Sequence, residues 1–414
     1  MDALRAGGAL RVGGSLRAAG ALRAVRLTLL LVCAALAACR EEDPRPTPPL
    51  LLVVVVDLSG PHATDGAQIR NGARLALLQA RATTSPEAGS SPGPLLRLVV
   101  FDDRGDPARA SALGRRLAGV PEVLAAIGPA DVAAARAAIP AYEAGRSGLP
   151  LLIPTVPGAD PRGDGRWSFR MGPGAGYIGE TLAWFLVTEL GIDSAATFVG
   201  QGPLGEAVAL GFAAEVRRLG GGTREPVLLS SGAPDRRIRE AAHVAPAIVL
   251  AGPARITGPA RAVLRRAGIE APILLSDVPD VAGPLDGEQA GVFYPLVFDP
   301  VGQRRARAFA DSYERVFGTP PQAPAALAYD AARLVLRAVR SGAMDRDSLR
   351  RWLRDASRQG AFHGATGNFF FTREGEVVRD LTIAAAGGGR TVRHGPVVRR
   401  RRRFVGGPAR RGSS

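Results

Sequence analysis

The chain has 414 residues, of which 46% are hydrophobic and 22% charged, a balance that excludes wholesale disorder and allows two or three domains. Its net charge of +15 is concentrated at the ends: residues 1–38 carry +4 and residues 390–414 carry +9, which leaves +2 for everything between them. A near-neutral body excludes a nucleic-acid reader. The sequence contains no lysine, which excludes Schiff-base and P-loop chemistry.

The first element is an apolar run from Leu27 to Ala38, which follows several arginines and precedes Cys39. This pattern predicts a secretory signal that is too short to span a membrane. Leu36-Ala37-Ala38-Cys39 resembles the lipobox of bacterial lipoproteins, which implies that Cys39 is acylated and becomes the mature N-terminus. The alternative is an ordinary signal peptide with an incidental cysteine, and translation from Val12 would give a signal of more usual length. Residues 40–49, with four prolines, are predicted to be an extended tether.

The next region alternates apolar runs with segments of helical spacing. Strands are predicted at 50–57, 95–102, 123–128 and 149–155, and helices at 66–82, 107–118 and 132–144. A second series of the same kind begins after residue 172. Its predicted helices are 177–190, 204–219, 236–242 and 255–267, and its predicted strands are 197–200, 227–230, 247–252 and 273–277. Such alternation predicts two mainly parallel sheets, each covered by helices on both faces.

The last third of the chain has a different order. A strand at 292–298 is followed by helices at 302–317, 324–341 and 347–358 and by strands at 368–371 and 376–384. Three helices so late in the chain suggest that it returns to the first series of strands and helices after completing most of the second. The arginine-rich tail is predicted to be disordered. Attraction to anionic headgroups or polymers and an unselected extension of the gene both remain open for it.

Gly174-Ala175-Gly176-Tyr177-Ile178-Gly179 matches the dinucleotide fingerprint G-x-G-x-x-G and opens a predicted helix. The acidic residue expected after the next strand is missing, because that strand runs into Gln201 and Gly202. We therefore predict no cofactor here, and a Rossmann-type oxidoreductase is a lesser alternative.

The four histidines are isolated in the sequence, so no metal site is predicted, and each is expected at the surface or in a turn. The paired acids Asp102 and Asp103 lie in a turn that leads to Pro107. Capping of the helix that starts at Pro107 explains this turn without catalysis. No catalytic residue is predicted.

Several short motifs occur in a characteristic order. They are Leu58-Ser59-Gly60-Pro61, Asn71-Gly72-Ala73, residues 101–107, Ile127-Gly128-Pro129, residues 149–154, Phe169-Arg170, residues 328–332 and residues 364–375. Together, over about residues 50–385, they resemble the branched-chain amino-acid binding family of periplasmic solute-binding proteins, the receptors of ABC importers. The resemblance implies an α/β fold of two doubly wound, Rossmann-like lobes joined by three crossover strands, the type I periplasmic binding protein. Lobe one would comprise 50–172 and 294–372, lobe two 173–293 and 373–389, and a basic tail 390–414.

The same resemblance implies where the ligand would be held. The implied contacts are Ser59, Asp65, Ala130, Asp131, Thr155 and Ala159 in lobe one and Leu204, Arg255 and Asp277 in lobe two. Four of these depart from the family pattern: Ala130 and Asp131 stand where a small hydroxyl is usual, Asp65 replaces an aromatic residue, and Leu204, followed by Gly205, replaces the Tyr of Tyr-Gly. An amino acid is therefore a doubtful ligand. Asp65 and Asp131 suit a cationic or polyhydroxylated solute if they face the cleft, and otherwise they are acids at helix starts.

The resulting hypothesis is a non-catalytic, extracytoplasmic, lipid-anchored binding protein. We expect a monomer that clamps a small polar solute and delivers it to an ABC permease, with no nucleic acid as partner and the membrane reached through its N-terminal lipid. The alternative is a lobe pair without transport that regulates an envelope enzyme or sensor.

Overall fold

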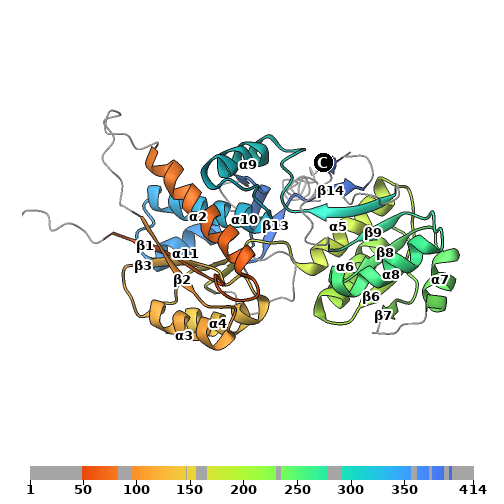
Figure 1. The fold of residues 1–414 in the computed structure, drawn as a ribbon, viewed down its shortest axis with the longest axis horizontal. Helices are drawn as coiled ribbons and strands as arrows, with labels where there is room; N and C mark the ends of the chain where they lie inside the picture. The colour runs from red at the N-terminus through yellow and green to blue at the C-terminus, as the bar shows by residue number, and fades with distance from the viewer. Residues whose placement is uncertain are drawn as a thin grey trace, which may run out of the picture. The chain divides into compact units, whose positions relative to one another are not determined.

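The computed structural model describes residues 49–82, 96–145, 147–154, 166–229, 235–277, 291–355, 361–372, 375–386 and 391–393. The predicted signal with Cys39, the tether up to residue 48, Thr155, Ala159 and the tail beyond residue 393 lie outside this range. The described elements form an α/β fold of two parallel-stranded sheets and a small third sheet (Figure 1).

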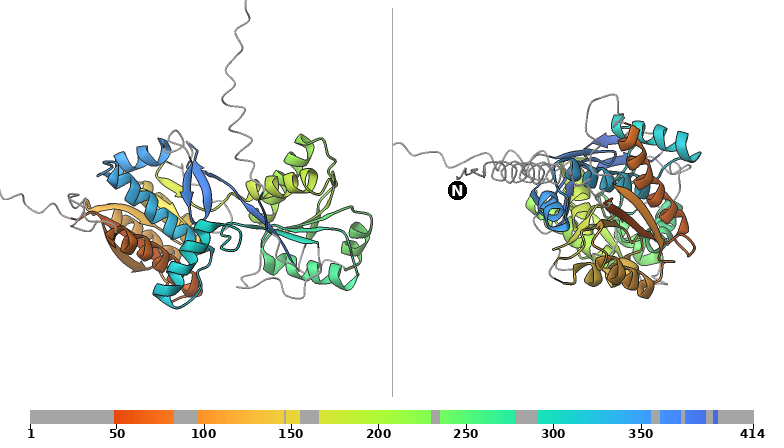
Figure 2. Two further views of the ribbon diagram at one scale, coloured as in Figure 1. Left: turned by 90° about the horizontal axis from the view of Figure 1, so that it is seen from above. Right: turned by 90° about the vertical axis from the view of Figure 1, so that its left-hand side faces the viewer.

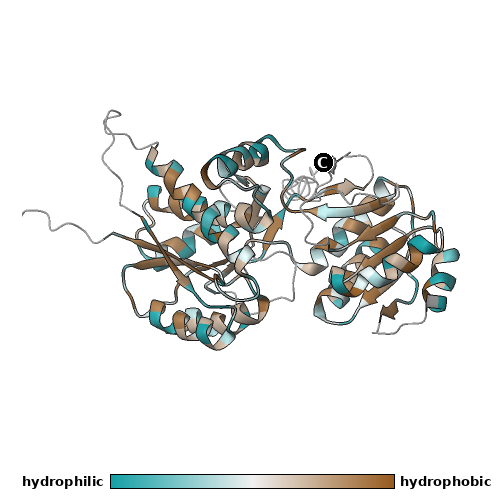
Figure 3. Cartoon of the chain, viewed as in Figure 1, coloured by the Kyte–Doolittle hydropathy of each residue, from teal (hydrophilic) through white to brown (hydrophobic). Residues whose placement is uncertain are grey.

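The first sheet has five strands in the order β2-β1-β3-β4-β5, all parallel. Their bounds are β1 Leu51–Val56, β2 Arg97–Asp102, β3 Val123–Ile127, β4 Leu151–Ile153 and β5 Ser168–Arg170. The continuous apolar run of β1 is buried on both faces: Val54 packs into one hydrophobic cluster and Val53 and Val55 into another. Figure 3 shows the same apolar character along the strands of the first sheet.

Helices from distant parts of the chain cover the first sheet. They are α2 Ala63–Ala82, α3 Pro107–Ala118, α4 Val132–Glu143, α9 Arg304–Phe317, α10 Ala323–Arg340 and α11 Arg346–Asp355. Helices α3 and α4 share one cluster with the sheet, and α2 and α10 share the other. A Cβ at Gly72 of α2 would overlap the carbonyl oxygen of Ala325 in α10, so these two helices touch along their backbones. The late helices therefore return to the first sheet, and Figures 1 and 2 both place α10 beside α2.

The second sheet has seven strands in the order β15-β14-β10-β9-β8-β6-β7. Their bounds are β6 Ala196–Gly200, β7 Val227–Leu229, β8 Ile248–Ala251, β9 Ile273–Leu275, β10 Val292–Leu296, β14 Thr382–Ala385 and β15 Thr391–Arg393. The flanking helices are α5 Ala175–Thr188, α6 Pro203–Arg218, α7 Asp235–His243 and α8 Ala254–Arg266. Strands β14 and β15 are antiparallel to their neighbours, whereas β6 to β10 form a parallel core.

Several details differ from the sequence-based expectations, including β5, which was not predicted as a strand. The segment 376–384, expected as one strand, forms two: β13 Val377–Arg379 and β14. The first of these pairs with β12 Gly367–Phe371, which itself pairs with the unpredicted β11 Phe362–Gly364, so the passage into the second sheet follows Arg379 instead of residue 373. Residues 391–393, expected within a disordered tail, form the edge strand β15, because the edge of β14 offers backbone partners.

A buried polar network holds the third sheet in place. The Asp330 carboxylate of α10 accepts hydrogen bonds from the N–H groups of Ala365 and Thr366, at 2.8 and 2.9 Å, and from Thr366 Oγ1 at 2.7 Å. The fully buried guanidinium of Arg379 donates to Thr366 Oγ1 at 2.5 Å and to the Met171 carbonyl oxygen at 3.0 Å. Its planar group also lies over the Phe369 ring, 5.2 Å from the centroid. Residue 171, helix α10 and the region 365–379 are thereby joined at one point.

Burial shifts the pKa values of the two charged groups of this network in opposite directions. It lowers the pKa of Arg379 to about 10, which still leaves the guanidinium protonated at neutral pH. It raises the pKa of Asp330, against the effect of the hydrogen bonds from Thr366 and Ala365. Removal of either partner would leave a buried charge without its compensation.

We predict that Asp330→Ala lowers the free energy of unfolding by about 3–5 kcal/mol, because two backbone N–H groups and the Thr366 hydroxyl lose their acceptor and Arg379 loses a nearby negative charge. Urea unfolding followed by circular dichroism measures this. Asp311→Ala, at an exposed position of α9, is the matched control and should stay within about 0.5 kcal/mol of the wild type. Equal midpoints for the two variants would contradict the role assigned to the network.

Candidate functional site

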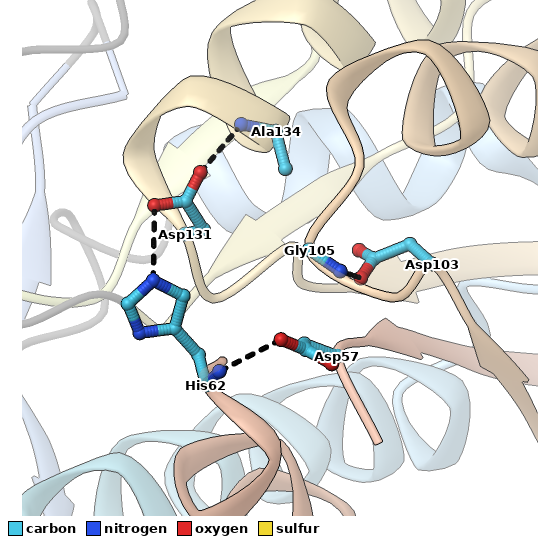
Figure 4. Close-up of polar contacts among 6 residues, drawn as sticks. All are labelled: Asp57, His62, Asp103, Gly105, Asp131 and Ala134. Carbon is cyan, nitrogen blue, oxygen red and sulfur yellow. Dashed lines mark hydrogen bonds and ion pairs between the residues drawn. The ribbon is translucent and has the colours of Figure 1, made fainter. Parts of the chain in front are cut away.

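Four aspartates gather where the strands of the first sheet end. Asp57 follows β1, Asp102 and Asp103 end β2, and Asp131 follows β3 at the start of α4. The carboxyl ends of parallel strands meet at one edge of a sheet, which is where open α/β folds bind ligands. We call this edge the aspartate rim; Figure 4 shows three of its carboxylates with His62.

Asp57 organises the loop between β1 and α2. Its buried carboxylate accepts hydrogen bonds from the backbone N–H groups of Ser59, Gly60 and His62, at 3.2, 2.5 and 2.8 Å. Gly60 has no room for a side chain, because a Cβ would overlap the carbonyl oxygen of Arg104. An internal carboxylate therefore takes up the donors that this loop could offer to an anionic ligand.

Asp102 and Asp103 bind the loop that follows β1 and the turn that follows β2. Asp102 accepts from Leu58 N and Arg104 N, both at 2.9 Å, and from Ser59 Oγ at 2.6 Å. Desolvation raises the pKa of Asp102, but these hydrogen bonds outweigh it and the pKa is lowered. Burial raises the pKa of Asp103, the Gly105 N–H opposes this, and the charges of Asp57, Asp102 and Asp131 raise it further. The carboxylates of the rim thus form one negatively charged group.

Asp131 is the N-cap of α4. One carboxylate oxygen accepts from Ala134 N at 2.9 Å, and the other lies 3.8 Å from Nε2 of the exposed His62. The cap fills the position at the helix N-terminus where a ligand carboxylate would otherwise find free N–H groups. The Asp131 side chain has a relative exposure of 26%, and Figure 4 shows its second oxygen directed at the His62 ring.

The second sheet presents three of the predicted contacts at its own carboxyl edge. Asp277, just after β9, accepts from Ala254 N at 2.9 Å and so caps α8. Arg255 is exposed in the first turn of α8. Leu204, in the first turn of α6, is buried, with a relative exposure of 7%. The N-terminus of α6 has no side-chain cap.

The choice of these positions as ligand contacts depends on the protein family, which comparison with known proteins identifies. The family model for periplasmic binding proteins matches residues 51–390. The chain belongs to this family. Its α/β fold is the type I periplasmic binding fold, as the resemblance implied. A search of curated proteins finds no match.

Solved structures of periplasmic binding proteins align over most of the chain. A chain assigned to a branched-chain amino acid ABC transporter from Rhodospirillum rubrum is 26% identical, with a TM-score of 0.71, and covers 84% of this chain and 100% of its own length. A substrate-binding protein from Desulfitobacterium hafniense in complex with Leu is 22% identical (TM-score 0.66; 84% and 100% covered). A solute-binding protein from R. palustris in complex with benzoate is 18% identical (TM-score 0.59; 84% and 96% covered).

Each predicted contact within the described residues lies at a strand end or the start of a helix of this periplasmic binding protein. Ser59 directs both its N–H and its hydroxyl to rim aspartates. Asp65 is half-buried in the first turn of α2, and Ala130 is half-buried just before α4. The contacts Thr155 and Ala159 lie outside the described residues.

Some rim residues were not singled out from the sequence as site residues. Asp57 and His62 received no role, although an aspartate directly after a buried strand is a signal for this edge. The turn 102–107 caps α3, as predicted, through Asp106, whose carboxylate lies 2.8 Å from Ala108 N. Asp102 and Asp103 of the same turn instead accept hydrogen bonds from neighbouring loop residues. His62, His243 and His363 are exposed, as predicted, and His394 lies outside the described residues.

Helix packing accounts for one glycine of the dinucleotide-like motif. A Cβ at Gly179 would overlap the carbonyl oxygen of Val208, and a Cβ at Gly211 of α6 would overlap that of Gly176. Helices α5 and α6 therefore approach closely along this part of the motif. A Cβ at Gly174 or Gly176 would make only ordinary contacts.

The described residues hold no group of three or more histidine, cysteine or acidic side chains suited to a metal ion. In the same part of the chain, none of the helices combines the length and apolar character needed to cross a membrane.

Proposed function

We propose that this periplasmic binding protein is a non-catalytic, lipid-anchored receptor that holds a cationic or polyhydroxylated solute between its lobes and delivers it to an ABC permease. The hydrogen bonding of the aspartate rim is the observation that supports this class of ligand. The N–H groups of residues 59, 60 and 62 and the start of α4 all donate to aspartates of the chain itself.

A rim whose donors already have partners presents acceptors to a ligand. The partly exposed Asp131 carboxylate and the lone pairs of Ser59 Oγ can accept hydrogen bonds, and the negative charge around Asp103 favours a positive group. A solute rich in donors, such as an amine or a polyol, complements this surface. An anion would face the charge of several carboxylates.

The solved relatives show why a carboxylate ligand has to be considered. Leucine and benzoate, which two of them hold, both carry a carboxylate. In this chain Asp131 caps α4 and Asp277 caps α8, so at these two helix starts an internal carboxylate occupies the place of an external one. Arg255, exposed beside the α8 cap, is positioned to hold a hydroxyl or a single carboxylate of an otherwise cationic solute.

The location and the partner follow from the family. Periplasmic binding proteins work outside the cytoplasm, and the predicted signal and lipobox would place this one on a membrane surface through Cys39. Binding that draws the lobes together would produce the state that a permease recognises.

We predict that a polyamine or an amino sugar raises the melting temperature, whereas benzoate does not. A ligand at a hundredfold excess over its Kd should stabilise the fold by about 2.7 kcal/mol. Asp131→Asn should weaken the binding at least about tenfold, because the charge is lost while asparagine still caps α4. Thermal shift over a panel of solutes, followed by calorimetric titration, measures both effects.

The control for that experiment is Asp345→Asn. Asp345 accepts from Ser348 N at 2.8 Å and so caps α11 in the same way. The neighbouring Arg346 binds carbonyl oxygens near the start of β3, which places this cap at the opposite edge of the first sheet. Solute affinity should not change in this variant. Stabilisation by benzoate but by no cationic or hydroxylated solute would refute the proposed ligand class.

The anchor is tested separately. Cys39→Ala should move the protein out of the membrane fraction or leave the signal uncleaved, because the acylated residue is lost. Cys33→Ala, inside the apolar run, is the matched control and should stay with the membrane. Mass spectrometry of the mature N-terminus reads the modification directly, and a soluble wild-type protein with an unmodified N-terminus would rule out the lipobox.

A further inference from the structure

A cavity of about 710 Å³ lies between helices α2, α9 and α10 and strand β11. The helices face it with positions three and four residues apart, such as 76, 79 and 80 of α2 and 305, 308, 309 and 312 of α9. Several of these positions hold alanine or serine, which leaves the space open. Helix α2 begins near the aspartate rim and reaches the cavity only at Ala76, about 20 Å along its axis at 1.5 Å per residue. The cavity is thus separate from the rim.

The charged residues that line this cavity are all basic. Arg305 comes from α9 and Arg333, Arg337 and Arg340 from α10, and the lining includes no aspartate or glutamate. The hydrogen bonds and ion pairs of the described residues include none made by these four guanidinium groups. We call the cavity the arginine groove.

Aromatic rings form part of the groove's lining and hold one arginine. The guanidinium of Arg333 lies 5.5 Å from the ring centroid of Tyr329 and 5.4 Å from that of Phe362. The Tyr329 hydroxyl donates to Gln79 Oε1 at 2.6 Å, which ties the ring to α2. These contacts fix Arg333 by cation–π attraction while leaving its N–H groups free of protein acceptors.

Favourable interaction with a helix dipole explains the positions of only some of these arginines. Arg337 and Arg340 lie in the last turn of α10, where a cation is favoured, but Arg305 lies in the first turn of α9, where it is not. The spacing of residues 333, 337 and 340 places like charges one turn apart on one face, which costs stability in the free protein. An anion bound among them would relieve this repulsion.

We infer that the arginine groove binds a small anion with several phosphate groups, at a site distinct from the solute rim. Guanidinium groups pair with phosphate through two parallel hydrogen bonds. Residues 333 to 340 span about 10 Å of helix, enough for two or more phosphates in a row. Two sources share this chemistry, a free polyphosphate and the headgroups of an anionic phospholipid.

The test uses the full mature chain with Arg399 to Arg403 changed to glutamine, so that the basic tail does not mask the groove. Inorganic triphosphate is titrated by calorimetry at low salt. Arg333→Gln with Arg337→Gln should weaken binding at least about tenfold. The matched control, Arg116→Gln with Arg265→Gln, removes two exposed arginines of α3 and α8 and should leave binding unchanged.

A second readout localises the anion. The imidazole NMR signals of His363, which lines the groove, should shift with triphosphate, while those of His62 at the rim should not. If the double variant is poorly folded, the shift of the His363 signals is measured with Arg337→Gln alone, where it should require more triphosphate than in the parent chain. Vesicles containing phosphatidylglycerol distinguish the sources: groove-dependent binding to vesicles alone identifies the headgroup, and binding of triphosphate identifies a free anion.

Equal weakening in the groove and control variants would overturn the inference, because it would reduce the effect to general surface charge. The same holds if neither triphosphate nor the vesicles bind in a groove-dependent way.

Discussion

The rest of the fold depends on the buried contact between Asp330, Thr366 and Arg379. Arg379 ends β13, the last strand before the chain enters the second sheet, and its guanidinium holds the Met171 carbonyl oxygen, where the chain first leaves the first sheet. The Tyr177 hydroxyl, in the first turns of α5, donates to the Arg379 carbonyl oxygen at 2.5 Å. Two passages between the sheets are therefore bound to each other and, through Asp330, to α10. The proposed closure on a solute would need such a fixed point, because lobes that move must keep their register.

The aspartate rim is the basis of the proposed ligand class. In both sheets, helix starts lie at the carboxyl edge, and their N–H groups would bind an anion. Here Asp57, Asp131 and Asp277 supply that anion from within the chain. Under the proposed function, the surface offered to the solute is therefore one of hydrogen-bond acceptors. These few side chains then set the preferred charge of the ligand.

Much of the fold could be predicted because its signals are local. The apolar run of β1 lies within the predicted strand 50–57, and α3 has the predicted bounds 107–118, since Pro107 follows a capping aspartate. The strands 368–371 and 376–384 were predictable, but β11 and the break between β13 and β14 were not. Arg379 has the pattern of a surface residue in a strand, whereas its burial depends on Thr366 and Met171. The rim's hydrogen bonds depend on a turn in which Arg104 and Gly105 take positive φ angles of 58° and 65°. No spacing rule predicts that turn, so Ser59 and Asp131 could be placed at the site but their partners could not.

The central claim is that a donor-rich solute is clamped between two lobes by carboxylates of the rim. Small-angle X-ray scattering of the wild-type mature protein, with and without the solute that stabilises it most, tests this most directly. We expect a smaller radius of gyration with the solute, and no change for Asp131→Asn at the same solute concentration when that concentration lies below the variant's Kd. A solute that saturates the wild-type protein without any decrease in radius would contradict the claim.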